Sequence, residues 1–406
     1  FTDPLVVTNE NFRFTVVQQL ADLNMRAGQI ILEPQPKNTA PAILAAALAS
    51  LAQDENAVLF IAPSDHRIDK DQKFYESIER AIPSVLDGKI ATFGVGPEYP
   101  ETGFGYIELD KQQHNNVFGV RKFIEKPSLK IAENMVSNGG FVWNAGMFMF
   151  RAVDIIKEFE RYAPDLTAKV QESVSAGTSD SNFFRLGEKP WNSITPDSID
   201  YLVLEKTENL VVAKLLSDWS DLGSWETVWK EMVPDAAMVS KSENAHAIDC
   251  TNTLLRSENN SQQIVGMGLD NIMAIAMPDA VLVVSKNKGQ DIKRVVEVLQ
   301  NVNVKQALEF PKDHRPWGWF ESLFLSDRFQ VKQLFVNPGA ALSLQSHVHR
   351  SEHWVVVEGS AKITVGDQVS LLREGESVFI PLGEKHRLEN PGKIALRIIE
   401  VQSGSY

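Results

Sequence analysis

Cysteine is almost absent from this 406-residue chain, since Cys250 is the only one. A single thiol excludes an internal disulfide and a cysteine-rich metal site, and it is typical of proteins kept in a reducing compartment. Long apolar runs are missing as well, because stretches such as 45–51 and 272–277 are far shorter than the roughly 20 residues that cross a bilayer. We therefore expect a cytoplasmic protein that does not bind a membrane.

Positive charge is also in short supply. Lys and Arg number 40 against 53 for Asp and Glu, so the formal net charge is −13. Because nucleic-acid-binding surfaces are basic, this balance argues against a nucleic-acid partner. An acidic protein still binds phosphorylated substrates where local basic side chains or bound metal ions offset the repulsion.

The length predicts two or three domains. In residues 1–232, short apolar segments at 5–8, 29–32, 57–61 and 89–93 alternate with helical periodicity. This order predicts an α/β fold, Rossmann-like, with a mostly parallel sheet.

The pattern changes after residue 232. Residues 233–303 are rich in short strands, show no long-period repeat and close with an amphipathic helix at 290–300. Residues 304–406 begin with a polar linker and continue as strands and glycine-containing turns, which predicts a small β-barrel. The strand-rich middle is a candidate for self-association, so we expect a homo-oligomer.

Histidines gather in the last domain. His347 and His349 alternate, which on a strand places both imidazoles on one face, and Glu352 and His386 follow. A divalent metal needs three or four such nitrogen and oxygen ligands with one position left open. A lone His-x-His pair is more often two surface histidines, but the added carboxylate and third imidazole favour a metal site.

The surrounding segments resemble the cupin superfamily and, within it, type II mannose-6-phosphate isomerase. The first cupin motif departs from the usual form, because Glu352 follows the histidine pair by one residue fewer. The resemblance implies a cupin β-barrel that holds Zn²⁺, Co²⁺ or a similar ion, and that interconverts mannose 6-phosphate and a ketose phosphate through an enediol. It also implies that Arg350 is catalytic or binds phosphate. The resemblance rests on segments 315–318, 345–354, 375–390 and 390–393.

Acidic and basic side chains follow the predicted strands of the first domain. Asp65 comes directly after the strand at 57–61, Asp221 lies in the segment 218–225, and Lys126 precedes Pro127. Ligands of open α/β sheets bind where strands end, and aspartates suit a metal that bridges phosphates. Each residue alone is only a weak indication of a metal or substrate site, because aspartates in loops usually form turns and most lysines are solvated on the surface.

Together these segments resemble the sugar-nucleotide pyrophosphorylases, and mannose-1-phosphate guanylyltransferase in particular. The resemblance implies that GTP and mannose 1-phosphate are the substrates, that Asp65 and Asp221 hold Mg²⁺ and that Lys126 binds the sugar phosphate. It also implies that Asn38 lies near the nucleotide. The residues expected to line the sugar pocket are Glu101, Gly105, Asn144 and Asp200.

The family begins with a strand and a glycine-rich loop that cradles the triphosphate, and no such loop precedes Leu5. We therefore expect that the sequence is part of a longer protein, or that its transferase half is inactive as it stands. Two other functions remain open. One is a transferase for another sugar or base, and the other is a transferase whose cupin is a structural or sugar-sensing module.

Overall fold

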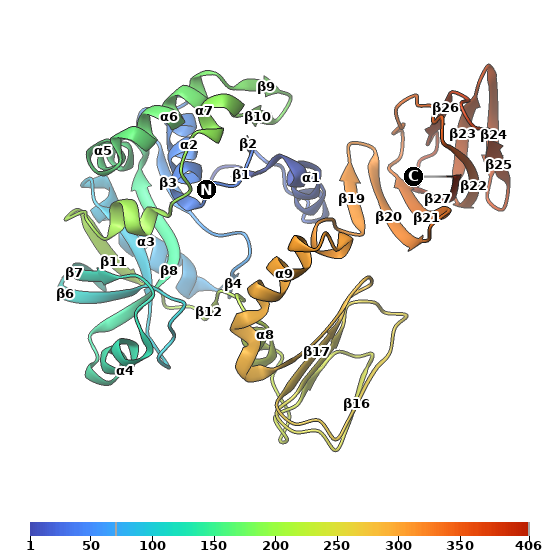
Figure 1. Cartoon of the computed structure of the whole chain (residues 1–406). Helices are drawn as coiled ribbons and strands as arrows, with labels where there is room; N and C mark the ends of the chain where they lie inside the picture. The colour runs from blue at the N-terminus through green and yellow to red at the C-terminus, as the bar shows by residue number, and fades with distance from the viewer. Residues whose placement is uncertain (70, 405–406) are drawn as a thin grey trace. The chain divides into compact units, whose positions relative to one another are not determined.

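The computed structural model describes residues 1–69 and 71–404. The chain divides into two compact units (Figure 1). One contains residues 1–13 and 24–223, and the other contains residues 14–23 and 224–406. A short 3₁₀ turn (Glu10–Phe12) and helix α1 (Arg13–Asp22) lie at the first boundary between them. Among the described residues, no helix combines the length and the apolar character needed to cross a membrane.

A six-stranded sheet forms the centre of the first unit. Its order is β3-β8-β5-β11-β7-β6, where β5 (Ile90–Val95) and β11 (Leu210–Lys214) pair in parallel. Strand β8 (Phe141–Arg151) runs antiparallel to both β3 (Val58–Ile61) and β5. The α/β fold class is confirmed, but β8 and β7 each run antiparallel to their neighbours, so this sheet is mixed rather than mostly parallel. A strand buried on both faces reads the same in either direction, so periodicity does not report its orientation.

A second, four-stranded sheet completes this unit. Here β1 (Leu5–Asn9) and β10 (Phe183–Arg185) both run parallel to β2 (Gln29–Glu33), and β9 (Thr178–Asp180) closes the edge. Residues 5–8 and 29–32 are therefore strands, as predicted.

Helices cover the sheets through apolar side chains. Helix α2 (Thr39–Leu51) is nearly all alanine and leucine and packs with α5 (Ala152–Tyr162) and α6 (Pro164–Ser175) in one core cluster. Helix α3 (Gln72–Leu86) packs in a separate cluster with residues of β5 and β8. The shorter elements are β4 (Arg67–Ile68), β6 (Tyr106–His114), β7 (Val117–Ile124), α4 (Leu129–Asn138), α7 (Glu188–Asn192), a π-helical turn (Asp200–Leu204) and β12 (Trp219–Ser220).

From residue 224 onward, the second unit contains α8 (Trp225–Glu231) and then a set of strands that stack in parallel. The stacked coils repeat every 19 residues: Thr251 donates to Asp270, and Asn252 donates to Asn271. Both asparagines have positive φ, which suits a tight corner between strands. The expectation of no long-period repeat was wrong. Strand partners such as Leu254 and Met273 also lie 19 residues apart, but equivalent positions carry different side chains, which hides the repeat in the sequence. The strands are β13 (Ser240–Lys241), β14 (Ala245–Ile248), β15 (Leu254–Ser257), β16 (Ile264–Met267), β17 (Ile272–Ala276) and β18 (Val281–Ser285).

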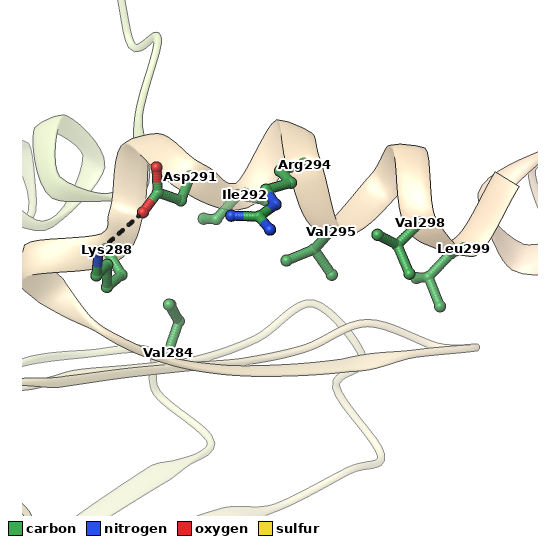
Figure 2. Close-up of a pocket in the computed structure, with 8 residues that line it drawn as sticks. All are labelled: Val284, Lys288, Asp291, Ile292, Arg294, Val295, Val298 and Leu299. Atoms are coloured by element: carbon green, nitrogen blue, oxygen red, sulfur yellow. Dashed lines mark ion pairs between the residues drawn. The ribbon is translucent and has the colours of Figure 1, made fainter. Parts of the chain in front are cut away.

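An amphipathic helix follows the stacked strands. A 3₁₀ turn (Lys286–Asp291) leads into α9 (Ile292–Asn301), close to the predicted helix at 290–300. Between α9 and β18 runs a groove of about 400 Å³ whose lining is mainly aliphatic, with an ion pair of 3.3 Å between Lys288 and Asp291 at one end (Figure 2). Its charged lining residues are Lys288 and Asp291, which pair with each other, and Arg294.

The last part of the chain forms a β-barrel from two sheets, of order β19-β20-β21-β27-β22-β25 and β24-β23-β26. Its core contains Leu334, Trp354, Ile363 and Ile398, all inward-facing. The end of the expected linker forms an edge strand, β19, after a 3₁₀ turn at 305–307. The strands are β19 (Lys312–Arg315), β20 (Gly318–Leu325), β21 (Phe329–Val336), β22 (Arg350–Glu358), β23 (Ser360–Val365), β24 (Gln368–Arg373), β25 (Ser377–Ile380), β26 (His386–Glu389) and β27 (Leu396–Gly404).

Candidate functional site

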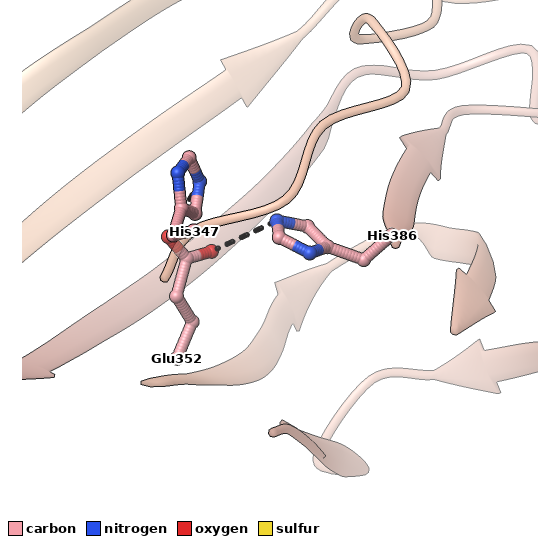
Figure 3. A group of neighbouring side chains, drawn as sticks. All are labelled: His347, Glu352 and His386. Carbon is pink, nitrogen blue, oxygen red and sulfur yellow. Dashed lines mark ion pairs between the residues drawn. The ribbon is translucent and has the colours of Figure 1, made fainter. Parts of the chain in front are cut away.

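Three side chains meet inside the barrel at positions suited to a metal ion. His347 lies in the segment before β22, Glu352 lies on β22, and His386 is the first residue of β26 (Figure 3). The Nε2 atoms of His347 and His386 lie 3.3 and 3.6 Å from the carboxylate oxygens of Glu352. The candidate ligand atoms of all three residues lie within 4.8 Å of one another.

The protonation of these groups suits a divalent ion. The Nδ1 of His386 lies 2.9 Å from the carbonyl oxygen of Glu384, so Nδ1–H donates there and Nε2 keeps its lone pair. That Nε2 is buried and has no hydrogen-bond partner within the described part of the chain. Burial, assisted by the charge of Arg350, lowers the pKa of His347 and favours the neutral imidazole that metals bind. The donor set therefore fits a metal with two imidazoles and one carboxylate.

His349 does not join this cluster. Its side chain is exposed, because residues 346–349 form an irregular bend rather than the strand on which the alternation argument relied. Gln345 lies beside the cluster instead: it pairs with His386 in an antiparallel bridge, with N–O distances of 3.0 and 2.9 Å between their backbones. Directly opposed residues of antiparallel strands project to the same face, so Gln345 shares the face of His386.

Arg350, for which the resemblance implies a catalytic or phosphate-binding role, lies at the cluster. Its Nε is 3.0 Å from Oε1 of Glu352, and its Nη2 is 2.9 Å from Nε2 of His347. Burial acts to raise the pKa of Glu352. The hydrogen bond from Glu400, together with the charge and the hydrogen bond of Arg350, outweighs it and holds that pKa below its ordinary value.

Buried side chains of β22 and β27 form hydrogen bonds that hold Glu352 in place. Sequence analysis did not predict these residues. The indole Nε1 of Trp354 lies 3.1 Å from Glu352 and 3.1 Å from Glu400. Gln402 donates to the same two carboxyl groups at 3.3 and 3.0 Å. Burial and the adjacent Glu352 raise the pKa of Glu400, so it is the protonated partner. The sequence signal that could have revealed this layer is the alternation of inward-facing and outward-facing residues along β27, which puts Glu400 and Gln402 on its buried face.

In the first unit, a chain of hydrogen bonds joins three elements. Thr92 on β5 donates to the side-chain oxygen of Asn144 on β8 at 2.8 Å, and Asn144 donates to Asp200 at 3.0 Å. The backbone N–H of Asn144 donates to the carbonyl oxygen of Gly105 at 2.8 Å. The structure therefore brings together Gly105, Asn144 and Asp200, and it adds Thr92, which sequence analysis did not single out.

Lys126 belongs to the same group. Its Nζ lies 3.0 Å from the carboxylate of Glu125, and burial together with Glu125 raises the pKa of Asp200 to about 6. Burial lowers the pKa of Lys126, but Glu125 and Asp200 outweigh that effect and leave it raised. A Cβ at Gly105 would lie 2.5 Å from Oε2 of Glu125, so only glycine leaves the carboxylate in place.

A two-stranded ladder brings the two predicted Mg²⁺ ligands toward each other. Strands β4 and β12 pair antiparallel, with Ser220 opposite Arg67. Asp65 precedes β4 and Asp221 follows β12, so both lie at the same end of the ladder. The indole of Trp219 donates to Nδ1 of His66 at 3.2 Å and ties the two segments together.

The other expected residues lie on loops of this unit. Asn38 caps helix α2, with Thr39 N–H donating to its side chain at 2.8 Å, and Thr39 in turn accepts from the N–H of Ile199, next to Asp200. Glu101 accepts hydrogen bonds from the two following backbone N–H groups at 2.8 and 2.9 Å. Five residues before Asn38 in the sequence, Glu33 ends β2. One of its carboxyl oxygens is buried with no hydrogen-bond partner among the described residues, and burial raises its pKa to about 7.

The arrangement of domains agrees with known families. Residues 1–237 match the nucleotidyl transferase family, residues 243–299 match the MannoseP isomerase/GMP-like beta-helix domain, and residues 302–406 match the mannose-6-phosphate isomerase C-terminal family. The first of these matches alone covers more than half of the chain.

Relatives with similar sequences extend over nearly the whole chain. The xanthan biosynthesis protein XanB of Xanthomonas campestris pv. campestris (strain B100) is 40% identical, over 99% of this chain and 85% of that protein. A mannose-1-phosphate guanylyltransferase of Sinorhizobium fredii is 41% identical, over 99% of this chain and 79% of the relative.

Among solved structures, one from Thermus thermophilus, described as a mannose-1-phosphate geranyltransferase, is 26% identical. It superposes with a TM-score of 0.63 and covers 73% of this chain and 84% of its own. The chain thus belongs to the nucleotidyl transferase family, among the mannose-1-phosphate guanylyltransferases that carry a mannose-6-phosphate isomerase C-terminal domain.

Proposed function

We propose that this chain is a two-activity enzyme of GDP-mannose synthesis. Its first unit transfers GMP from GTP to mannose 1-phosphate, in a reaction in which a phosphate oxygen of mannose 1-phosphate attacks the α-phosphorus and pyrophosphate leaves. Its cupin interconverts mannose 6-phosphate and fructose 6-phosphate. Asn144 and Asp200, which are hydrogen-bonded to each other, carry the first assignment together with the nearby Lys126, because they place partners for sugar hydroxyls beside a cation.

The roles in the first unit follow from the chemistry of each group. Asp200 accepts a hydrogen bond from a sugar hydroxyl. Asn144, which accepts a hydrogen bond from Thr92, donates to Asp200 and orients its carboxylate. Lys126 pairs with the sugar phosphate, while Gly105 and Glu101 complete the wall of the pocket. Asn38 lies toward the nucleotide. Asp65 and Asp221 would hold Mg²⁺, which supplies charge neutralisation on the triphosphate when it is bound.

In the cupin, His347, Glu352 and His386 would hold a divalent ion such as Zn²⁺ or Co²⁺. Such an ion polarises the carbonyl of the open-chain sugar when it is bound. Gln345, rather than the exposed His349, supplies the fourth protein ligand through its amide oxygen, since it shares the face of His386. Arg350 binds an anionic oxygen of the substrate beside the cluster.

Two assays test the proposal separately. Pyrophosphate release from GTP and mannose 1-phosphate with Mg²⁺ reports the transferase, and a panel of hexose 1-phosphates and nucleoside triphosphates reports its selectivity. Preference for UTP or glucose 1-phosphate would contradict the assignment of substrates. Conversion of mannose 6-phosphate to fructose 6-phosphate, with and without prior metal removal, reports the cupin. A metal-loaded cupin without turnover would leave it a structural or sugar-sensing module.

A further inference from the structure

The barrel interior carries a polar layer that extends beyond the metal cluster. Along β21, β27 and β22, Lys332 lies opposite Glu400, and Glu400 lies opposite Trp354. Residues directly opposite each other on antiparallel strands project to the same face. Since Glu400 and Trp354 point into the barrel and hydrogen-bond there, Lys332 points inward as well.

The other polar side chains of this layer have partners. Gln330 donates to Ser322 at 2.8 Å, and Gln402 donates to Glu352 and Glu400. The half-buried Lys332 forms no ion pair with any residue in the described part of the barrel, and its ammonium lies 5.0 Å from the ring centre of Phe320.

The neighbouring cation is already engaged. Arg350 contacts both His347 and Glu352, at 2.9 and 3.0 Å, so its guanidinium stays beside the metal cluster. Lys332 lies two strands away from Glu352 in the sheet, about 10 Å at the usual strand spacing. A cation displaced in this way from the ligands suits a substrate whose reacting carbons sit at the cluster and whose negative charge sits at the far end of a six-carbon chain.

We propose that the ammonium group of Lys332 binds the phosphate group of the sugar phosphate in the cupin pocket. This inference rests on the proposed isomerase function. It gives the pocket two ends: His347, Glu352 and His386 at the carbonyl end, and Lys332 at the phosphate end. It also explains why a lysine is held in the interior, where burial lowers its pKa despite the opposing effect of Glu400 and where no carboxylate of the described residues forms an ion pair with it.

The test compares three variants. Lys332→Met keeps the length of the side chain and removes its charge, and Lys332→Arg restores the charge. Lys362→Met removes a charge from the same barrel at a lysine that already pairs with Glu389 at 3.2 Å, and it is the matched control. Cupin metal content, the melting temperature, the calorimetric affinities for mannose 6-phosphate and mannose, and the isomerase kcat and KM are measured for each.

We expect Lys332→Met to weaken mannose 6-phosphate binding by about tenfold or more, as for one lost charge-assisted hydrogen bond. Its metal content, its kcat and its affinity for mannose should stay close to those of the wild type. Lys332→Arg should recover part of the affinity, and Lys362→Met should change none of these quantities.

Three results would overturn the inference. They are unchanged mannose 6-phosphate affinity in Lys332→Met, a fall in kcat with KM unchanged, and loss of metal or folding in both Lys332 variants. If the wild-type protein binds mannose 6-phosphate but does not isomerise it, only the isomerase function is refuted. The affinities of the wild type and the Lys332 variants for mannose 6-phosphate then still decide the role of Lys332. Wild-type protein that does not bind it would sink both.

Discussion

His386 and Glu352 lie with Nε2 and Oε2 3.6 Å apart, although they belong to strands of different sheets. Both side chains are almost completely buried. A buried imidazole whose free nitrogen faces a buried carboxylate, with no other partner for that nitrogen, is the arrangement that a metal ion completes.

His386→Ala should therefore remove the cupin metal. A ligand contributes directly to the bond, so the loss of affinity should exceed the roughly 10–100-fold typical of residues that only support a ligand. Metal content after dialysis, measured by mass spectrometry, checks this. His349→Ala is the matched control and should keep its metal, because His349 lies exposed outside the cluster. Equal metal loss in both variants would refute this ligand set.

Trp354→Phe should weaken metal binding without unfolding the barrel. The indole N–H holds Glu352 and Glu400 together, whereas the ring itself fills the core, which phenylalanine largely preserves. We expect a loss of about tenfold in metal affinity, measured by competition with a chelator. Trp319→Phe serves as the control, since Trp319 stacks on Phe335 at 5.2 Å and donates to neither carboxyl group. Unchanged affinity in Trp354→Phe would mean that Glu352 needs no such support.

Glu33 should make the stability of the protein depend on pH. Burial raises its folded pKa from an ordinary 4.5 to about 7, so its contribution is fully present below pH 4.5 and is lost as the pH rises through 7. Between pH 5 and pH 8 this loss amounts to about 2–3 kcal/mol. The free energy of unfolding in urea is measured between pH 5 and pH 8. For Glu33→Gln it should lack that part of the decline with pH, whereas for Glu133→Gln, at an exposed position of α4, it should follow the wild type. If the free energies of unfolding of Glu33→Gln and the wild type fall in parallel with pH, Glu33 is ionised throughout this pH range and its pKa is not raised.

Asp221→Asn should raise the Mg²⁺ concentration needed for pyrophosphate release. The substitution removes one of the two negative charges that Asp65 and Asp221 supply, which weakens a site for a hard cation. We expect the Mg²⁺ concentration for half-maximal pyrophosphate release to rise by at least about tenfold, equivalent to about 1.4 kcal/mol. Asp218→Asn, at an exposed position before β12, is the control and should leave the Mg²⁺ dependence unchanged. The same shift in both variants would point to general electrostatics instead of a ligand.

The sequence predicted the parts of the fold that depend on local periodicity. Apolar runs such as 29–32 lie in strands because burial on both faces leaves a continuous apolar signal. The direction of β8 and the 19-residue stacking of Asn252 on Asn271 depend on partners far along the chain, which local periodicity does not record.

The same distinction holds at the sites. His386 could be found because it lies in a segment, 375–390, that resembles the cupins, whereas the placement of His349 depended on assuming a strand where the chain bends. Glu400 and Thr92 carry no motif of their own. Their roles come from strand pairing, which puts Glu400 beside Trp354 and Thr92 beside Asn144.

The ladder between β4 and β12 joins only two residues on each side, so few hydrogen bonds hold Asp65 near Asp221. Short ladders at the end of a domain open far more often than central strands do. Opening this one would separate the two aspartates while the six-stranded sheet stays closed. A cation that binds both carboxylates would hold the ladder closed, so Mg²⁺ should slow amide exchange at Ser220 and at Asp69, whose N–H donates to Asp218, while exchange of the β5 amides stays unchanged.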